Sequence, residues 1–295
     1  MVTSSNIQSL DVGDYDVEGV SSYCMELRTV QSGAVKTCIE GLKEFLTDTN
    51  IEFDESGMKI MSMDSKKNVL VHLFIDGSKC EYYSCKKNFT IGISVLLLHK
   101  IIRTVTNNNT ITFALDENDI NHLEIKIDNG EKNMKSSYKL KLFDLPNSKM
   151  YTDSMEYNSV ITLPSVDFQK ICRDMANIGD EVEVKDVQNQ LIFTCSSQEK
   201  EIYHEAVIYD GETSAKSKGV SRASNRKKDA HDIVQGVFPM KYLNQCTKFT
   251  PLCTTVDIML RNDYPMLVRY YVASLGELKL CLAPKEGKNE TIPPL

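Results

Sequence analysis

The feature that most constrains the fold of this chain is an internal repetition in the order of its predicted elements. Segments with apolar residues at helical spacing are separated by short segments in which apolar and polar residues alternate, as in strands with one buried face. Each half of the chain reads as helix, three strands, helix, three strands, and the halves are offset by roughly 130 to 145 residues. The predicted helices are 33–46, 94–105, 165–178 and 238–249, and the predicted strands are 50–53, 57–63, 69–75, 109–115, 122–127, 138–143, 181–185, 190–195, 202–209, 254–260, 266–272 and 277–282.

The repetition predicts an α+β fold made of two copies of one helix-and-sheet domain. Between the halves, the segment "DLPNSKMYTDSMEYNS" contains a proline and lacks any periodic pattern, so it is predicted to be a linker that crosses the surface. The polar ends of the chain also lack periodicity and are predicted to be disordered. The predicted boundaries are an extension at 1–22, a domain at 23–143, the linker at 144–159, a domain at 160–285 and a tail at 286–295.

The charge balance limits the kinds of partner. The chain has 41 Asp and Glu residues against 34 Lys and Arg residues, a net charge of −7, which argues against a protein covered on all sides by nucleic acid. No apolar run approaches the ~20 residues that span a bilayer, and the polar start does not resemble a signal peptide, so no membrane association is expected. Nine cysteines occur singly, without a CxxC pair, which predicts reduced core residues.

Against this acidic background, all four predicted helices carry paired cations. In "FQKICRDMANIGD" (168–180), the apolar residues form one stripe, and the free face opposite, with Lys170 and Arg173, is interpreted as carrying cations and no acid. A solvated face is the ordinary explanation for one such helix, but four of four indicate a surface for a polyanion, contacted through phosphates without sequence preference. The eight cations are Lys36, Lys43, Lys100, Arg103, Lys170, Arg173, Lys241 and Lys248.

Five short motifs now point to a known family. "MDSKKNVLV", "YSCKKN", "FQKICRDMANIGD", "KYLNQCTKFTPL" and "LAPK" occur in this order, and together with the duplication they make the chain resemble proliferating cell nuclear antigen, the eukaryotic-type DNA sliding clamp, from about Cys24 to Lys285. The resemblance implies a head-to-tail homotrimer whose helices surround duplex DNA, with the eight cations facing the pore. Asn177 stands where the family has a histidine, so a protonation-dependent contact is not expected there.

The resemblance also implies a docking pocket for partner peptides with a Gln-x-x-aliphatic-x-x-aromatic-aromatic motif. The alternative for its sheet residues, Met63 and Leu70 above all, is ordinary core packing. This sequence departs from the family pattern at Lys67, Asn68 and Cys281 and in the linker, which predicts a pocket of altered shape. The positions that match the pocket are Met63, Leu70, Met150, Tyr151, Pro265, Cys281 and Ala283.

Two strands, 136–145 and 200–210, match the family's subunit joint. Both alternate as sheet edges do, and unpaired backbone groups at an edge invite pairing with another chain. Lys139 and Lys141 in the first strand complement an acidic bias in the second; the alternative is that each is an internal hairpin strand. The predicted interface residues are Tyr138, Leu140, Leu142, Ile202, Tyr203 and Ala206.

Two segments depart from the family. "SAKSKGVSRASNRKK" (214–228), within the predicted loop 211–231, holds six cations and no acid where the family has an acidic loop. It could be a nuclear-localisation signal, an extra DNA or partner contact, or a solvated insertion. Gln188 stands where eukaryotic clamps carry a ubiquitin-acceptor lysine, and Lys185 is a weak substitute.

An enzymatic activity is not expected. The sequence lacks nucleotide-binding and zinc-protease motifs, its five histidines are isolated, and no cofactor or metal is predicted. The sequence therefore predicts a DNA sliding clamp that acts with a DNA polymerase and a clamp loader, either in the nucleus or at a cytoplasmic viral replication site. The alternatives are a subunit of a heterotrimeric checkpoint-type clamp and a monomeric DNA-binding polymerase accessory factor.

Overall fold

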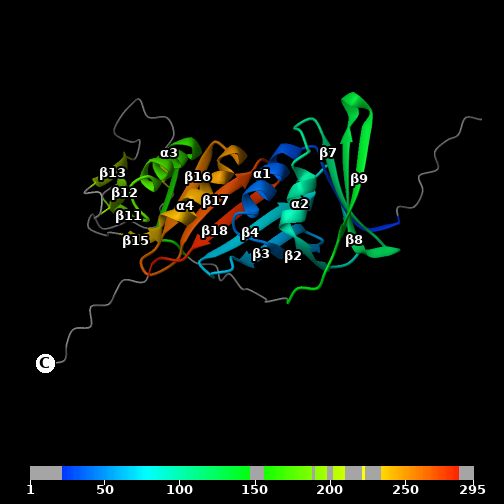
Figure 1. Cartoon of the computed structure of the whole chain (residues 1–295), viewed down its shortest axis with the longest axis horizontal. Coiled ribbons are helices and arrows are strands. Elements are labelled where there is room, and N and C mark those ends of the chain that lie inside the picture. The colour runs from blue at the N-terminus through cyan, green and yellow to red at the C-terminus, as the bar shows by residue number, and fades with distance from the viewer. Residues whose placement is uncertain are drawn as a thin grey trace, which may run out of the picture.

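The described residues form three antiparallel sheets with four α-helices on one side of them (Figure 1). The structure, a computed structural model, describes residues 22–146, 156–187, 190–197, 202–209, 221–222 and 234–285. The helices are α1 (Ser32–Leu42), α2 (Val95–Ile102), α3 (Ser165–Ala176) and α4 (Met240–Cys246), with 3-10 turns η1 (Gly77–Lys79), η2 (Gly130–Lys132) and η4 (Thr247–Leu252). The strands are β1 (Tyr23–Thr29), β2 (Asp48–Asp54), β3 (Gly57–Met63), β4 (Val69–Asp76), β5 (Tyr82–Cys85), β6 (Phe89–Ser94), β7 (Thr110–Asp116), β8 (Asp119–Asn129), β9 (Met134–Lys141), β10 (Ser159–Pro164), β11 (Glu181–Val187), β12 (Gln190–Ser197), β13 (Ile202–Tyr209), β14 (Ser221–Arg222), β15 (Val234–Pro239), β16 (Thr255–Leu260), β17 (Met266–Val272) and β18 (Gly276–Leu282).

The largest sheet joins the two halves of the chain. Its nine strands run in the order β14-β10-β16-β17-β18-β4-β3-β2-β6, so strands of the second half and the first half share one sheet. The junction is the β18–β4 pair, whose register runs from Gly276 opposite Ile75 to Leu282 opposite Val69. A five-stranded sheet, β5-β1-β7-β8-β9, closes the first half, and a four-stranded sheet, β13-β12-β11-β15, closes the second.

The helices lie on one face of the molecule because each has a single apolar stripe. In α3, Phe168, Cys172 and Met175 are almost completely buried, at the 3- and 4-residue spacing that places them on one side of a helix. Figure 1 shows α1, α2, α3 and α4 on the side nearest the viewer, in front of the sheets. The predicted helical layer is therefore present, and the residues opposite the buried stripes share one surface.

A strand precedes each helix, and the predicted repeat lacks these strands. They are β1, β6, β10 and β15, and β5 is a further strand that the alternation pattern did not reveal. The predicted helix 238–249 is wrong at both ends: Phe238 and Pro239 pair with β11, and η4 begins at Thr247. These strands are short and run directly into helices, so neither period extends far enough to be recognised.

Helices of the two halves pack against each other at the centre of the molecule. Phe249 of η4 lies against α1, and its ring stacks on that of Phe45, in the turn after α1, with centroids 6.3 Å apart. A Cβ placed on Gly41 would come within 2.2 Å of the Phe249 ring, so only glycine allows this approach. The helical layer is thus continuous across the halves, as the nine-stranded sheet is.

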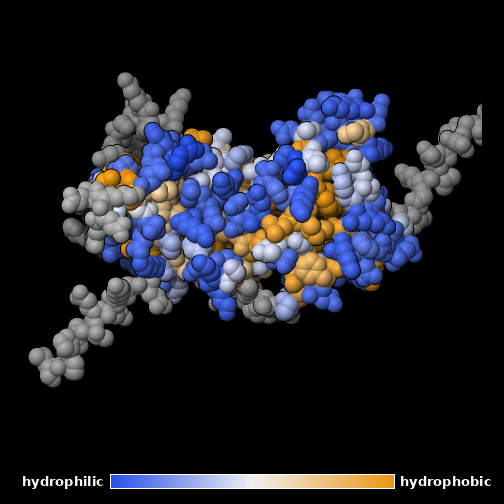
Figure 2. Space-filling view, viewed as in Figure 1, coloured by the Kyte–Doolittle hydropathy of each residue, from blue (hydrophilic) through white to orange (hydrophobic). Residues whose placement is uncertain are grey.

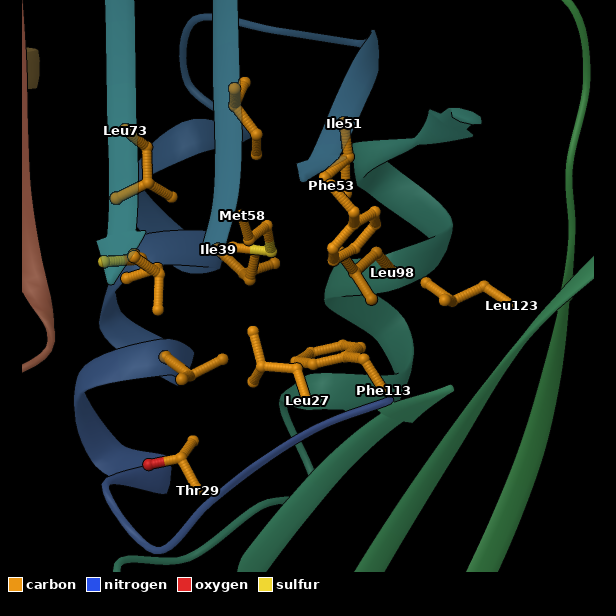
Figure 3. A pocket seen from close by; sticks show the side chains of 14 residues that line it. Leu27, Thr29, Ile39, Ile51, Phe53, Met58, Leu73, Leu98, Phe113 and Leu123 are labelled. Atoms are coloured by element: carbon orange, nitrogen blue, oxygen red, sulfur yellow. The ribbon is translucent and has the colours of Figure 1, made fainter. Parts of the chain in front are cut away.

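A small apolar cavity lies inside the first half (Figure 3). Figure 3 shows Leu27, Ile39, Leu73 and Leu98 among the side chains that converge on it from the sheets and from α1 and α2. Its volume is 20 Å³, and Thr29 is the one hydroxyl-bearing residue of its lining. A water needs several polar partners, so this space is a packing imperfection of the core and not a ligand site.

Candidate nucleic-acid and partner interfaces

The helical layer brings the eight predicted cations to one side of the molecule. Six of them are exposed: Lys100 on α2, Arg103 at the C-terminal end of α2, Lys170 and Arg173 on α3, Lys241 on α4 and Lys248 in η4. Lys36 and Lys43, on α1 and at its C-terminal end, are partly buried. The surface over α1 and α4 is predominantly hydrophilic (Figure 2). Charges gathered in this way can attract phosphates even though the whole chain is acidic.

Two of the cations on α1 already have partners within the chain. Lys36 Nζ donates to the carbonyl oxygens of Arg103, at 3.0 Å, and Val105, at 2.9 Å. These two hydrogen bonds link α1 to the C-terminal end of α2, where the free carbonyl groups of a helix attract a positive charge. Lys43 Nζ lies 3.8 Å from a carboxylate oxygen of Glu44. These two residues therefore offer less free charge to a ligand than the six exposed cations do.

Two details of the predicted cationic face are wrong. Asp174 is exposed four residues after Lys170, on the same side of α3, so the free face of this helix does carry an acid. Lys241 and Lys248 do not stack as two full α-helical turns would place them, because α4 ends at Cys246 and Lys248 lies in η4. The tighter 3-10 geometry rotates Lys248 relative to an α-helical position.

The two strands predicted to join subunits are both sheet edges, at opposite ends of the molecule (Figure 1). Strand β9 ends the five-stranded sheet and β13 ends the four-stranded sheet. On β13, Ile202 and Tyr203 are 45% and 64% exposed, large values for apolar side chains. The interpretation of β9 and β13 as internal hairpin strands is therefore wrong for the described part of the chain.

The predicted interface residues of β9 differ from one another. Tyr138 and Leu142 are partly buried, as is Ala206 on β13, whereas Leu140 is only 4% exposed. Leu140 lies opposite Leu123 of β8 and points into the core of its own chain. Tyr138 and Leu142, two residues before and after it, share this side and pack against the same core while staying partly exposed. The prediction for Leu140 is corrected: it belongs to the core and offers little surface to another chain.

Exposed apolar residues also lie on the helices nearest the two edges. Leu96 and Leu97 of α2 are 45% and 47% exposed, and Val166 of α3 is 61% exposed. Helix α2 contacts β9, and Figure 1 shows α3 at the same end of the molecule as β13. These residues were not predicted from the sequence, although their apolar character on a predicted free face is the signal that could have found them.

The sheet residues of the predicted peptide pocket form one row. Met63 lies opposite Leu70, Leu70 opposite Cys281, and Cys281 opposite Leu267, across β3, β4, β18 and β17. Facing residues of antiparallel strands point to the same side, and Met63, Leu70 and Cys281 are all partly exposed. Neighbouring Leu73 points into the core beneath the helices, so the row occupies the opposite face (Figure 3). Ordinary core packing is therefore wrong for Met63 and Leu70.

Residues just outside the ends of β17 and β18 border this apolar row. Pro265 precedes β17 and Ala283 follows β18, and both are partly buried. Ala283 N donates to the carbonyl oxygen of Asn68, at 2.8 Å, which fixes the end of β18 beside the β3–β4 turn. The predicted pocket residues Met150 and Tyr151 lie outside the described residues, as do Gln188 and most of the segment 214–228.

The end of the linker is bonded to Arg261, which precedes β17, and the sequence did not predict this contact. Arg261 Nη1 donates to the carbonyl oxygen of Glu156, at 3.3 Å, and its guanidinium lies 3.9 Å from the centre of the Tyr264 ring. Burial, followed by the nearby Cys281 thiol, raises the pKa of Tyr157 to about 12. Tyr157, which is partly buried, is thus close enough to Cys281 to sense its charge. Burial likewise raises the pKa of the Cys281 thiol to about 11, so it is protonated and apolar at neutral pH.

Other features of the described residues limit the possible chemistry. The described part of the chain has no group of three or more His, Cys, Asp and Glu side chains suited to holding a metal ion. Among the described helices, none is both long and apolar enough to cross a membrane. All nine cysteines are unpaired, and five of them are buried.

Comparisons with known proteins agree with this geometry. The family model of the proliferating cell nuclear antigen N-terminal domain matches residues 24–149, and that of the C-terminal domain matches residues 152–285. The chain is also similar to a probable DNA polymerase sliding clamp 1 of Paramecium bursaria Chlorella virus 1. The two are 29% identical over 262 residues, which cover 88% of this chain and 95% of the viral protein.

Proposed function

This chain belongs to the proliferating cell nuclear antigen family, and from that premise we propose how its surfaces perform the work of a DNA sliding clamp. The chain functions as a sliding clamp: it interacts with DNA and DNA polymerase and associates with further subunits. Clamps of this family are scaffolds without catalytic activity of their own, and we assign no reaction to this chain. Its action is mechanical, because it keeps other proteins on the template.

The proposed assembly is a homotrimeric ring. Strand β9 of each subunit pairs with β13 of the next, which satisfies backbone groups that a single chain leaves open at both ends. The exposed apolar residues beside these edges, Leu96, Leu97, Val166, Ile202 and Tyr203, support contact with a neighbouring chain. Exposed Lys139 and Lys141 on β9 would meet Glu205 on β13, which favours head-to-tail over like-with-like pairing.

The observation that carries the DNA-binding proposal is the gathering of the four helices and their cations on one side of the sheets (Figure 1). In a ring built through β9 and β13, this side faces the centre. A closed ring cannot leave uncut duplex, so the cations need only weak, sequence-independent phosphate contacts that hold DNA near the axis and allow sliding. The six exposed cations supply most of this charge, and Lys36 and Lys43 contribute less.

The remaining partners follow from the outer surface. The row of Met63, Leu70 and Cys281 is proposed to receive apolar side chains of Gln-x-x-aliphatic-x-x-aromatic-aromatic peptides from the polymerase and other replication proteins. A clamp loader is proposed to open and close the ring. The chain acts where DNA is replicated, which we propose is the nucleus or, for a virus-encoded clamp, a cytoplasmic replication site.

Mass measurement by light scattering across concentrations tests the assembly. We expect a homotrimer of the 33.4 kDa chain. A monomer at every concentration would contradict the ring, and it would favour the accessory-factor alternative if the monomer binds DNA. A monomer that assembles only with two different chains would favour the checkpoint-type alternative.

A further inference from the structure

The turn between β3 and β4 presents two lysines at the edge of the apolar row. Lys66 and Lys67 lie between Met63 and Leu70, the first two members of the row, and both are exposed. Neither lysine has an ion pair with any described residue of the chain. Because the protein carries a net charge of −7, two uncompensated cations beside an apolar docking surface are a local exception to its overall charge.

The turn is held rigidly in this position. The buried carboxylate of Asp64 accepts hydrogen bonds from the backbone N–H groups of Asn68, at 2.6 Å, and Val69, at 2.8 Å. Its other oxygen accepts from Lys66 N at 3.3 Å. Asn68 Nδ2 donates to the Tyr242 hydroxyl of α4, at 2.8 Å, so the turn is also fastened to the other half of the chain. A fixed turn loses little freedom when a ligand binds to it.

Lys67 has an uncommon backbone conformation, which it shares with three other non-glycine residues of the described chain. Its φ is 59°, in the left-handed region that glycine or asparagine usually occupies. A lysine in this conformation is strained, and strained residues persist where the surroundings hold them and often where they serve a site. The Asp64 hydrogen bonds provide that restraint, and their effect is to hold the lysine at the rim of the row.

The charges around the rest of the row differ in their availability. Arg269 is paired with Asp257 at 2.7 Å, and Lys279 is paired with Glu277. In the turn before β17, the partly buried Arg261 has its guanidinium over the Tyr264 ring and is close in sequence to the exposed acid Asp263. Among these cations, Lys66 and Lys67 are the two that are both exposed and without an ion pair to a described residue, and they lie next to Met63 and Leu70.

We infer that the docking surface prefers peptides with aspartate or glutamate in the positions next to their apolar anchors. The apolar side chains cover Met63, Leu70 and Cys281, and the acids reach Lys66 and Lys67. This inference rests on the proposed peptide-docking role of the same surface and adds the charge of the partner to it. Complementary charge at the rim of an interface gives specificity and faster association more than raw affinity.

Labelled peptides that share the same apolar anchors test the inference by fluorescence anisotropy. Three peptides carry aspartate, serine or lysine in the positions next to the anchors. At low salt we expect the aspartate peptide to bind about threefold to tenfold more tightly than the serine peptide, as for one or two exposed charge pairs. The lysine peptide should be the weakest, and added salt should reduce the differences because it screens exposed charges.

Two double variants separate the turn from general charge. Lys66→Gln with Lys67→Gln should make the three affinities equal, whereas Lys79→Gln with Lys87→Gln, the same change of charge at exposed positions away from the turn, should preserve the order. Equal binding of all three peptides to the unaltered protein would overturn the inference and leave the pocket standing. If none of the peptides binds, the pocket proposal itself fails, and the inference with it. A turn variant that weakens duplex DNA binding but keeps the peptide order would assign the lysines to DNA and also overturn the inference.

Discussion

At the scale of single residues, the eight cations of the helical side are unequal. Lys170 and Arg173 are exposed on α3, whereas the Lys36 ammonium is held by two carbonyl oxygens. A substitution at the first two residues should therefore remove free charge without removing packing. Substitution of Lys36 would also break a link between helices.

Lys170→Ala with Arg173→Ala should leave folding and mass unchanged and weaken binding to short duplexes of any sequence. Each phosphate contact that is lost should lower the slope of log affinity against log salt by about 0.9. Titrations at several salt concentrations measure this slope. Lys79→Ala with Lys87→Ala, at exposed positions outside α1–α4 and outside β9 and β13, removes the same charge and serves as the control. A double variant with the unaltered slope would place α3 outside the DNA-binding surface.

Cys281 offers a second test at this scale. Its thiol has a pKa of about 11 because of burial, so little reactive thiolate is present at pH 8. Alkylation by iodoacetamide, followed by mass spectrometry of the modified peptide, should be slower than for a free cysteine and should accelerate as the pH approaches 11. A bound partner peptide should protect the residue further. Rapid alkylation at pH 7 would show that the thiol is not buried beneath Tyr157 and its neighbours.

At the scale of elements, the contact between α1 and η4 tests how the halves are joined. Gly41→Ala places a methyl group against the buried Phe249 ring and should lower the free energy of unfolding by about 1–3 kcal/mol. Urea denaturation measures this loss. Gly33→Ala, in the same helix, meets only the exposed and movable Asn107 side chain and should stay within about 0.5 kcal/mol of the unaltered protein. Equal losses of unfolding free energy in both variants would show that the contact with Phe249 does not cause the loss.

Strand β13 tests the proposed joint between subunits. Ile202→Lys adds a positive charge to an exposed edge position that would lie near Lys139 and Lys141 of the next subunit. Light scattering at low micromolar concentration should then report monomers. Tyr271→Lys makes a comparable change on the outer face of the nine-stranded sheet and should keep the trimer. Trimers of both variants would remove β13 from the joint.

The sequence predicted most helices and strands, but it did not predict all their boundaries or the contacts between distant segments. Strands β3, β13 and β17 begin and end at the predicted residues because their alternation is long and clear. Strands β1, β6, β10 and β15 were missed because each is followed closely by a helix, so the period-2 alternation soon gives way to the helical period. The row of Met63, Leu70 and Cys281 required the family resemblance, since the sequence shows the alternation of each strand but not the register between strands. Tyr157 and the Asp64 turn depend on contacts between distant segments, which no local pattern records.

At the scale of the whole molecule, deletion of the basic segment 214–228 tests whether this segment contributes to assembly or to polymerase stimulation. Only the backbone of its residues Ser221 and Arg222 is described, as the short strand β14 beside β10. If the segment is a solvated insertion, its deletion should leave trimer mass and polymerase stimulation on primed circular DNA unchanged. Reduced stimulation by a variant that still forms trimers would instead make the segment a contact site.

The nine-stranded sheet also determines where the proposed ring of these subunits can bend. Strands β18 and β4 are joined by seven residue pairs, and the Phe45 and Phe249 rings stack between the halves. The junction between the two halves of a subunit is therefore rigid. The seam between two subunits rests on one pair of edge strands and is the compliant part of such a ring. In the proposed ring, bending imposed by a clamp loader would be concentrated at a seam, so we expect DNA to enter between two subunits while each subunit keeps its shape.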